Sequence, residues 1–139
     1  MNILVTGSGG QLGHALRRAS VASADRYFFT DVAGDDTLRL DITDREATIN
    51  YIRRHQPDTV INCAAFTNVD GCEVNHDAAF KANAIGPRNL AQAATKTGAR
   101  LVHVSTDYVF SGRENGGIPQ DEATIPGPIS AYGSTKLMG

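Results

Sequence analysis

The sequence feature that most constrains the fold is a glycine spacing near the N-terminus, Gly7-x-x-Gly10-x-x-Gly13. It follows the apolar run at residues 3–5 and opens a stretch of helical pattern over residues 11–22. A glycine turn between a strand and a helix is where parallel α/β proteins bind the pyrophosphate of a dinucleotide. Gly7 would permit the tight turn, Gly10 would let the backbone approach the ligand, and Gly13 would let helix and strand pack closely. The spacing predicts a dinucleotide site, with an ordinary tight turn as the alternative.

Apolar runs and helical patterns alternate along the rest of the chain. We expect strands over residues 3–5, 26–30, 38–42, 58–62 and 100–105, and helices over 11–22, 43–55, 74–97 and from about 132. Thr43 and Glu46 predict a capping box at the second helix, and Gly98 is a natural residue to end the third. Residues 111–131 are rich in Gly, Pro and Ser and predict a loop. The alternation predicts right-handed crossovers and one α/β domain over 1–139, a doubly wound parallel sheet of the Rossmann type.

Composition argues against several classes of protein. With 41% hydrophobic and 20% charged residues, the chain is expected to fold, and its net charge of −2 gives no basic surface for nucleic acid. No apolar run reaches the roughly 20 residues that span a bilayer, and the N-terminus lacks the pattern of a secretory signal. Cys63, Cys72 and four scattered histidines predict neither a disulfide framework nor a metal site. We expect a cytoplasmic protein without nucleic-acid or membrane partners.

An aspartate at the end of the second predicted strand bears on the choice of cofactor. Asp31 lies about 20 residues beyond the glycine loop, where an acidic residue hydrogen-bonds the adenosine ribose. A carboxylate there would repel a 2′-phosphate and favour NAD(H), although Arg17 and Arg18 are near enough in sequence to leave NADP(H) open. The alternative for Asp31 is an ordinary turn residue. Asp41 and Ile42 fall where the adenine is expected, with a capping or turn role as the alternative for Asp41.

Polar or small residues end the fourth and fifth predicted strands, and ligands of open parallel sheets bind beyond such carboxyl ends. The small side chains of residues 62–65 would let a cofactor pass close to the backbone, and residues 105–108 follow the fifth strand. Tyr132 and Lys136 are four positions apart and share one face of a helix. Tyrosine has an ordinary pKa of about 10, and a nearby ammonium stabilises the phenolate. The pair therefore predicts a general acid or base for a carbonyl–alcohol interconversion, assisted by the hydroxyl of Ser105 or Thr106; a solvated helix face is the alternative.

Five strings together resemble the dTDP-4-dehydrorhamnose reductases, a branch of the extended short-chain dehydrogenase/reductase superfamily. They are TGSGGQLG (6–13), LDITD (40–44), PDTVINCAAFTNVDGCE (57–73), STDYVFSG (105–112) and YGSTK (132–136). The glycine loop and YxxxK define only the superfamily, whereas the combination points to the branch. The implied reaction is NAD(P)H-dependent reduction of the C4 ketone of dTDP-4-dehydro-L-rhamnose.

The resemblance also implies roles for individual residues. Tyr132 would be the proton donor, Lys136 would hold the nicotinamide ribose, and Thr106 would bind the C4 oxygen of the sugar beside Asp107 and Tyr108. The remaining implied cofactor contacts are Gly7, Gly10, Gln11 and Leu12 at the pyrophosphate, Asp31, Asp41 and Ile42 at the adenosine, and Cys63, Ala64, Ala65 and Thr67 along the sheet. The alternative for residues 107–110 is structural, with Asp107 capping a turn and Tyr108 and Phe110 in the core. Members of the family often hold magnesium at a dimer contact, and we see no magnesium site in this part of the chain.

The resemblance covers the whole chain but only the N-terminal half of the family's usual length. We therefore expect a Rossmann domain truncated after about five strands, without the C-terminal substrate-binding region, and a fragment of weak or absent turnover. Two other functions stay open: a reductase-like regulatory subunit that binds nucleotide, and another sugar-nucleotide reductase or epimerase. The presence of Tyr132, Lys136 and Thr106 together argues against a pure binding subunit.

Overall fold

A parallel sheet forms the centre of the molecule in the computed structural model, which describes residues 1–33, 38–113 and 119–139. Its strands are β1 (Asn2–Thr6), β2 (Arg26–Asp31), β3 (Leu38–Arg39), β4 (Thr59–Asn62) and β5 (Arg100–His103). They lie in the order β3-β2-β1-β4-β5, and every neighbouring pair is parallel. This order reverses direction at β1, so the predicted doubly wound sheet is confirmed.

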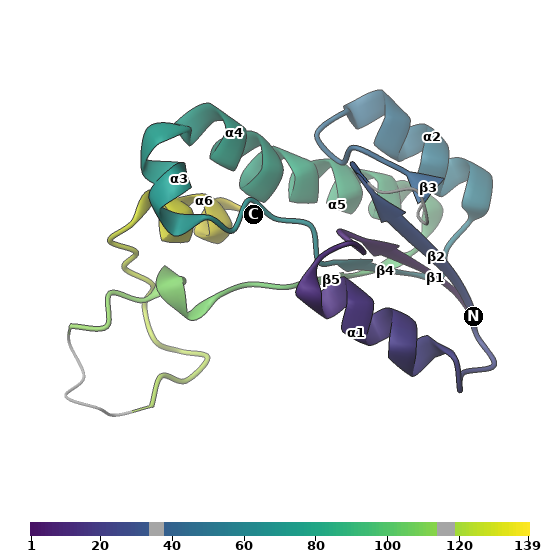
Figure 1. The fold of residues 1–139 in the computed structure, drawn as a ribbon, viewed down its shortest axis with the longest axis horizontal. Coiled ribbons are helices and arrows are strands. Elements are labelled where there is room, and N and C mark those ends of the chain that lie inside the picture. Colours follow the sequence, from purple (N-terminus) through teal and green to yellow (C-terminus); the bar gives the residue numbers. More distant parts are fainter. Residues whose placement is uncertain (34–37, 114–118) are drawn as a thin grey trace.

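Helices cover both faces of the sheet and gather beyond its carboxyl edge. Figure 1 shows α1 (Gln11–Ser20) on one face and α2 (Arg45–His55) with α5 (Gly86–Thr97) on the other. Beyond the strand ends lie α3 (Val69–Val74), α4 (His76–Phe80), the π-helix η1 (Lys81–Ile85), the 3₁₀ turn η2 (Asp107–Val109) and α6 (Ala131–Met138). None of the helices in the described ranges is long and apolar enough to cross a membrane.

The strand register separates an apolar core from a polar edge. Leu4 pairs with Phe28 and Val60 in the middle of the sheet, and all three are buried beneath Ile52 of α2 and Leu90 of α5. The last rung at the carboxyl edge is polar, because the register aligns Thr30, Thr6, Asn62 and His103. The sheet therefore presents hydrogen-bonding side chains where ligands of such folds bind.

The N-cap of the second helix lies one residue later than the sequence predicts. Asp44, and not Thr43, is the N-cap, and its carboxylate accepts a hydrogen bond of 2.9 Å from the amide of Ala47. The Thr43 hydroxyl instead donates to the carboxylate of Asp41 over 2.8 Å. The capping-box prediction was wrong because Asp41 engages Thr43 in a turn and leaves Asp44 as the free cap.

The single helix predicted over residues 74–97 is also wrong, since the segment is divided. Asn75 has φ −121° and ψ 53°, which ends α3 and separates it from α4. From His76 onward the chain is continuously helical but passes through the π turn η1 before α5. Gly98 ends α5 with φ 76°, as predicted.

Other boundaries differ by a few residues. Helix α1 ends at Ser20 instead of 22, β3 stops at Arg39, β5 stops at His103 and α6 begins at Ala131. Of the predicted loop over 111–131, residues 114–118 lie outside the described part, and residues 119–130 contain neither helix nor strand.

Candidate functional site

The glycine loop joins β1 to α1 in a conformation that its glycines make possible. Gly7 has φ 67°, and a Cβ atom there would collide with the backbone of Ala64 after β4. A Cβ on Gly13 would collide with the backbone of Ser8, so Gly13 lets α1 pack against the loop. Gly10 is the N-cap of α1 and donates to the Gly7 carbonyl over 3.1 Å. The loop therefore directs the unpaired amides of the first turn of α1 outward.

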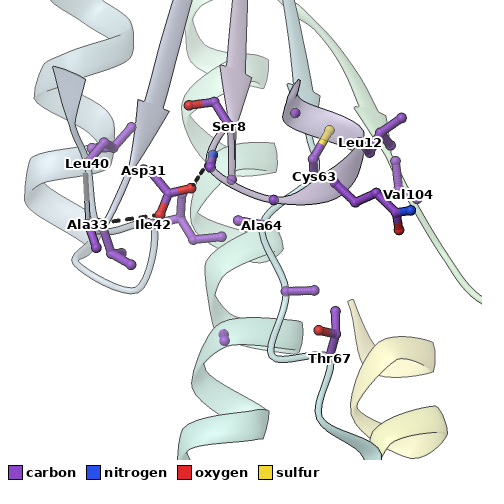
Figure 2. Close-up of a pocket in the computed structure, with 18 of the residues that line it drawn as sticks. Ser8, Leu12, Asp31, Ala33, Leu40, Ile42, Cys63, Ala64, Thr67 and Val104 are labelled. Carbon is purple, nitrogen blue, oxygen red and sulfur yellow. Dashed lines mark hydrogen bonds between the residues drawn. The ribbon is translucent and has the colours of Figure 1, made fainter. Parts of the chain in front are cut away.

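A pocket of about 1230 Å³ extends from this loop across the carboxyl edge of the sheet to α6. Figure 2 shows Asp31, Leu40 and Ile42 on one side of the loop, with Cys63 and Leu12 on the other. Every residue predicted to contact a cofactor lines it: Gly7, Gly10, Gln11, Leu12, Asp31, Asp41, Ile42, Cys63, Ala64, Ala65, Thr67, Tyr132 and Lys136. An elongated pocket with a helix N-terminus in its wall fits a dinucleotide.

Asp31 connects the end of β2 to the glycine loop. One of its carboxylate oxygens accepts from the Gly9 amide over 2.8 Å, and the other accepts from the Ala33 amide over 3.3 Å (Figure 2). Arg17 also lines the pocket, with its guanidinium 4.3 Å from the centre of the Phe29 ring. The lining of the pocket thus includes both the carboxylate of Asp31 and the guanidinium of Arg17, whereas Arg18 is not among its lining residues.

Hydrogen bonds join the polar side chains of the last rung of the sheet, next to the residues that line the pocket. Oδ1 of Asn62 accepts from the Thr6 hydroxyl over 2.6 Å and from the Ala64 amide over 3.1 Å. Its Nδ2 lies 3.0 Å from Nδ1 of His103. Burial, together with the nearby ammonium of Lys136, lowers the pKa of His103. Burial likewise raises the pKa of the Cys63 thiol, which argues against a reactive thiolate in the pocket wall.

Tyr132 and Lys136 project from one face of α6 into the same pocket. Lys136 is only 4% exposed, and its Nζ donates a hydrogen bond of 2.6 Å to the Val104 carbonyl. Burial lowers the pKa of this lysine. The Tyr132 ring packs edge-on against Tyr108, with the ring centres 5.5 Å apart. The alternative of a solvated helix face is therefore wrong for the lysine.

The predicted substrate residues after β5 do not line this pocket. Ser105 lines it, whereas Thr106, Asp107 and Tyr108 are not among its lining residues. The Thr106 hydroxyl donates to Asp107 over 3.1 Å and accepts from the Tyr108 amide over 3.3 Å, which caps η2. Tyr108 is 46% exposed, so its alternative role in the core is wrong.

Comparison with known proteins agrees with this geometry. The sequence model of the family described as RmlD substrate binding domain matches residues 1–139. The chain belongs to this family. The dTDP-4-dehydrorhamnose reductase of Mycobacterium tuberculosis (strain H37Rv) is 42% identical over 140 residues, which cover 99% of this chain and 43% of that protein.

Solved structures of the family have the same fold. A dTDP-4-dehydrorhamnose reductase from Clostridium acetobutylicum superimposes with a TM-score of 0.91 and 46% identity, covering 99% of this chain and 47% of that one. The enzyme of the same name from Bacillus anthracis, solved in complex with NADP, gives 0.87 and 37%, covering 99% and 46%. The chain thus spans less than half the length of these relatives.

Several residues of this site were not found from the sequence. Glu73, Asn83 and Thr135 make hydrogen bonds to segments far away in the chain, and no local pattern indicates such bonds. Gly133 was detectable, because a glycine inside a helical motif suggests close backbone approach. A Cβ there would collide with the Tyr108 carbonyl. Within the described ranges, no three His, Cys, Asp or Glu side chains cluster as a metal site would require.

Proposed function

We propose that this chain carries the cofactor-binding part of an NAD(P)H-dependent reductase that converts the C4 ketone of dTDP-4-dehydro-L-rhamnose to the alcohol of dTDP-L-rhamnose. The observation that carries the proposal is the single pocket that contains both the glycine loop and the Tyr132–Lys136 pair. The names of the relatives support the substrate, and the NADP complex of the Bacillus anthracis relative supports the cofactor.

The residues of the pocket would contact successive parts of the cofactor along its length. The first turn of α1, with Gly10, Gln11 and Leu12, would hold the pyrophosphate by its free amides. Asp31, Asp41 and Ile42 would hold the adenosine, and residues 63–67 would line the path toward Tyr132. Lys136 would bind the nicotinamide ribose. A reduced nicotinamide bound in this way supplies the hydride for the ketone carbon.

The protein's own part in the reaction is to supply a proton. As the carbonyl oxygen gains negative charge, the Tyr132 hydroxyl donates its proton to that oxygen and becomes a phenolate. The ammonium of Lys136, on the same helix face, stabilises this phenolate. Ser105 or Thr106 would donate a hydrogen bond to the same sugar oxygen. Asp107 and Tyr108 would contact the rest of the sugar.

The test uses the complete polypeptide that contains this chain, NADPH and dTDP-4-dehydro-L-rhamnose, with NADPH absorbance as the readout. Tyr132→Phe should lower kcat by about 100-fold or more and leave the Kd for NADPH nearly unchanged. Tyr27→Phe is the matched control, because Tyr27 stacks on Phe29 in β2 and lacks contact with the pocket. Turnover by Tyr132→Phe within about two-fold of the wild type would contradict the proposal.

Product analysis separates the remaining functions. Net consumption of NADPH indicates reduction, whereas an epimerase returns its hydride and consumes none. A protein that binds NADPH but turns over no sugar nucleotide would be the regulatory subunit. The same proposal includes three further expectations: weak turnover by residues 1–139 alone, a homodimer of the complete protein, and a cytoplasmic location. Gel filtration tests the homodimer.

A further inference from the structure

The helix that carries Tyr132 and Lys136 is short, and its position depends on contacts from other elements. Helix α6 has eight residues, and a helix of this length is not stable without packing. On one side the backbone of α6 lies so close to the Tyr108 carbonyl that only glycine fits at position 133. The opposite side meets η1, a π turn of the kind often found at functional sites.

The contact with η1 is a buried chain of hydrogen bonds that ends on Tyr132. Asn83 is fully buried, and its side chain accepts from the Phe66 amide over 2.8 Å and donates to the Phe66 carbonyl over 3.1 Å. Its second N–H donates to the Thr135 hydroxyl over 3.0 Å. That hydroxyl donates in turn to the Tyr132 carbonyl over 3.0 Å. Two hydrogen bonds to the Phe66 backbone fix the position of the Asn83 side chain. The Thr135 hydroxyl is therefore bound to a group that is itself held in the protein core.

A second contact holds the beginning of α6. The carboxylate of Glu73, at the end of α3, accepts from the Ala131 amide over 2.8 Å, one residue before Tyr132. The Ser130 hydroxyl accepts from the Gly133 amide within the same turn. A negative charge is favourable at a helix N-terminus. This contact is exposed to solvent, so we expect it to matter less than the buried one.

We propose that Thr135 is a positioning residue that sets where Tyr132 and Lys136 face the pocket, with Glu73 as a weaker second anchor. This inference rests on the proposed function, because it assigns to Thr135 an effect on the proton donor. The hydroxyl of Thr95 in α5, by comparison, donates to the Ala91 carbonyl over 2.9 Å within its own helix. Thr135 differs because its hydroxyl also accepts from the buried Asn83.

The test compares Thr135→Val, Thr135→Ser and the control Thr95→Val in the complete polypeptide. Valine keeps the shape of threonine and removes the hydroxyl, so the Tyr132 carbonyl and one N–H of Asn83 lose their partner. We expect kcat to fall by about ten-fold or more in Thr135→Val and the Kd for NADPH to change by less than about three-fold. Thr135→Ser should restore most of the turnover, and Thr95→Val should match the wild type. Equal kcat in Thr135→Val and the wild type would overturn the inference.

Two further measurements test the inference if Thr135→Val does not fold or if the wild type shows no turnover. If Thr135→Val does not fold, Glu73→Ala and Glu73→Gln replace it: kcat should fall by about five-fold in the alanine variant only, since glutamine retains an oxygen acceptor. Equal kcat in both would overturn the inference. If the wild type reduces no sugar nucleotide, the proposed function fails by itself. Hydrogen exchange of the α6 amides then decides: faster exchange in Thr135→Val supports the positioning role, and equal exchange overturns it.

Discussion

The side-chain amide of Asn62 donates a hydrogen bond to Nδ1 of His103, with the two nitrogens 3.0 Å apart. The other end of the amide accepts from Thr6 and from the Ala64 backbone, which determines the orientation of the amide. Nδ1 of His103 must therefore accept, so the ring proton of the neutral imidazole is on Nε2. A protonated ring would place a second N–H against the Asn62 amide, directly beneath the pocket.

This relationship predicts a loss of stability in acid. The pKa of His103 is lowered by burial and by Lys136, so below about pH 6.5 the unfolded chain takes up a proton that the folded chain resists. The free energy of unfolding should fall as the pH falls through this window. Urea unfolding at about pH 7.5 and pH 5.5 measures it, and His103→Gln should lose less. The unfolding free energy of His103→Gln will still depend on pH to some extent, because burial also lowers the pKa of His55. The same loss in His103→Gln as in the wild type would contradict the prediction.

Alanine at two glycine positions should separate packing from backbone conformation. Gly13→Ala forces a Cβ into the backbone of Ser8, and we expect it to cost about 1–3 kcal/mol and to weaken NADPH binding by displacing the loop. Gly98→Ala, with φ 76° and open space around it, should cost about 1 kcal/mol and leave the Kd for NADPH unchanged. The measurements are urea unfolding and fluorescence titration. An unchanged Kd in Gly13→Ala would show that the loop tolerates the shift.

Asp31→Asn should change the choice between the two nicotinamide cofactors. The substitution removes a negative charge next to the Gly9 amide while keeping an oxygen that can accept its hydrogen bond. Repulsion of a 2′-phosphate disappears, so the ratio of NADPH to NADH affinity should rise by about ten-fold. Titration with each cofactor measures the ratio. Arg17→Gln, which removes a guanidinium from the pocket lining, should lower the ratio of NADPH to NADH affinity. An unchanged ratio in both variants would place the 2′ position elsewhere.

Lys136→Met should separate stability from function. The ammonium is 4% exposed and its pKa is lowered by burial, so the charged group is held in the fold at a cost in free energy. Methionine loses the bond to Val104 but removes that cost, and such replacements are often neutral or stabilising. We expect an unfolding free energy equal to or above that of the wild type, with weaker NADPH binding and little turnover. Clear destabilisation together with normal binding would contradict this.

The sequence was sufficient for the architecture because the signals involved are local. Alternating apolar runs and helical patterns predicted all of the observed strands, and the glycine spacing predicted the turn between β1 and α1. The sequence was not sufficient where two neighbouring residues could perform the same role. Thr43 and Asp44 are both good caps, and only the bond from Thr43 to Asp41 shows which one is free.

The candidate site was predictable to the same extent. Residues that belong to a short motif, such as Gly7 or Tyr132, could be predicted, and they line one pocket. Asn83 and Thr135 were not found, because their meaning arises from a contact across 52 positions of sequence. The π turn that presents Asn83 has no sequence signal of its own, and the helical pattern around it predicts ordinary α-helix.

The lining of the pocket begins at Gly7 and ends at Lys136. On the ribosome, the first of these residues would emerge long before the last. A nascent chain could form the glycine turn early, yet the pocket would lack its far wall until α6 had packed against η1 and η2. Full occupancy by a dinucleotide would then distinguish a chain in which α6 has packed from one in which it has not, and by mass action it would favour the former.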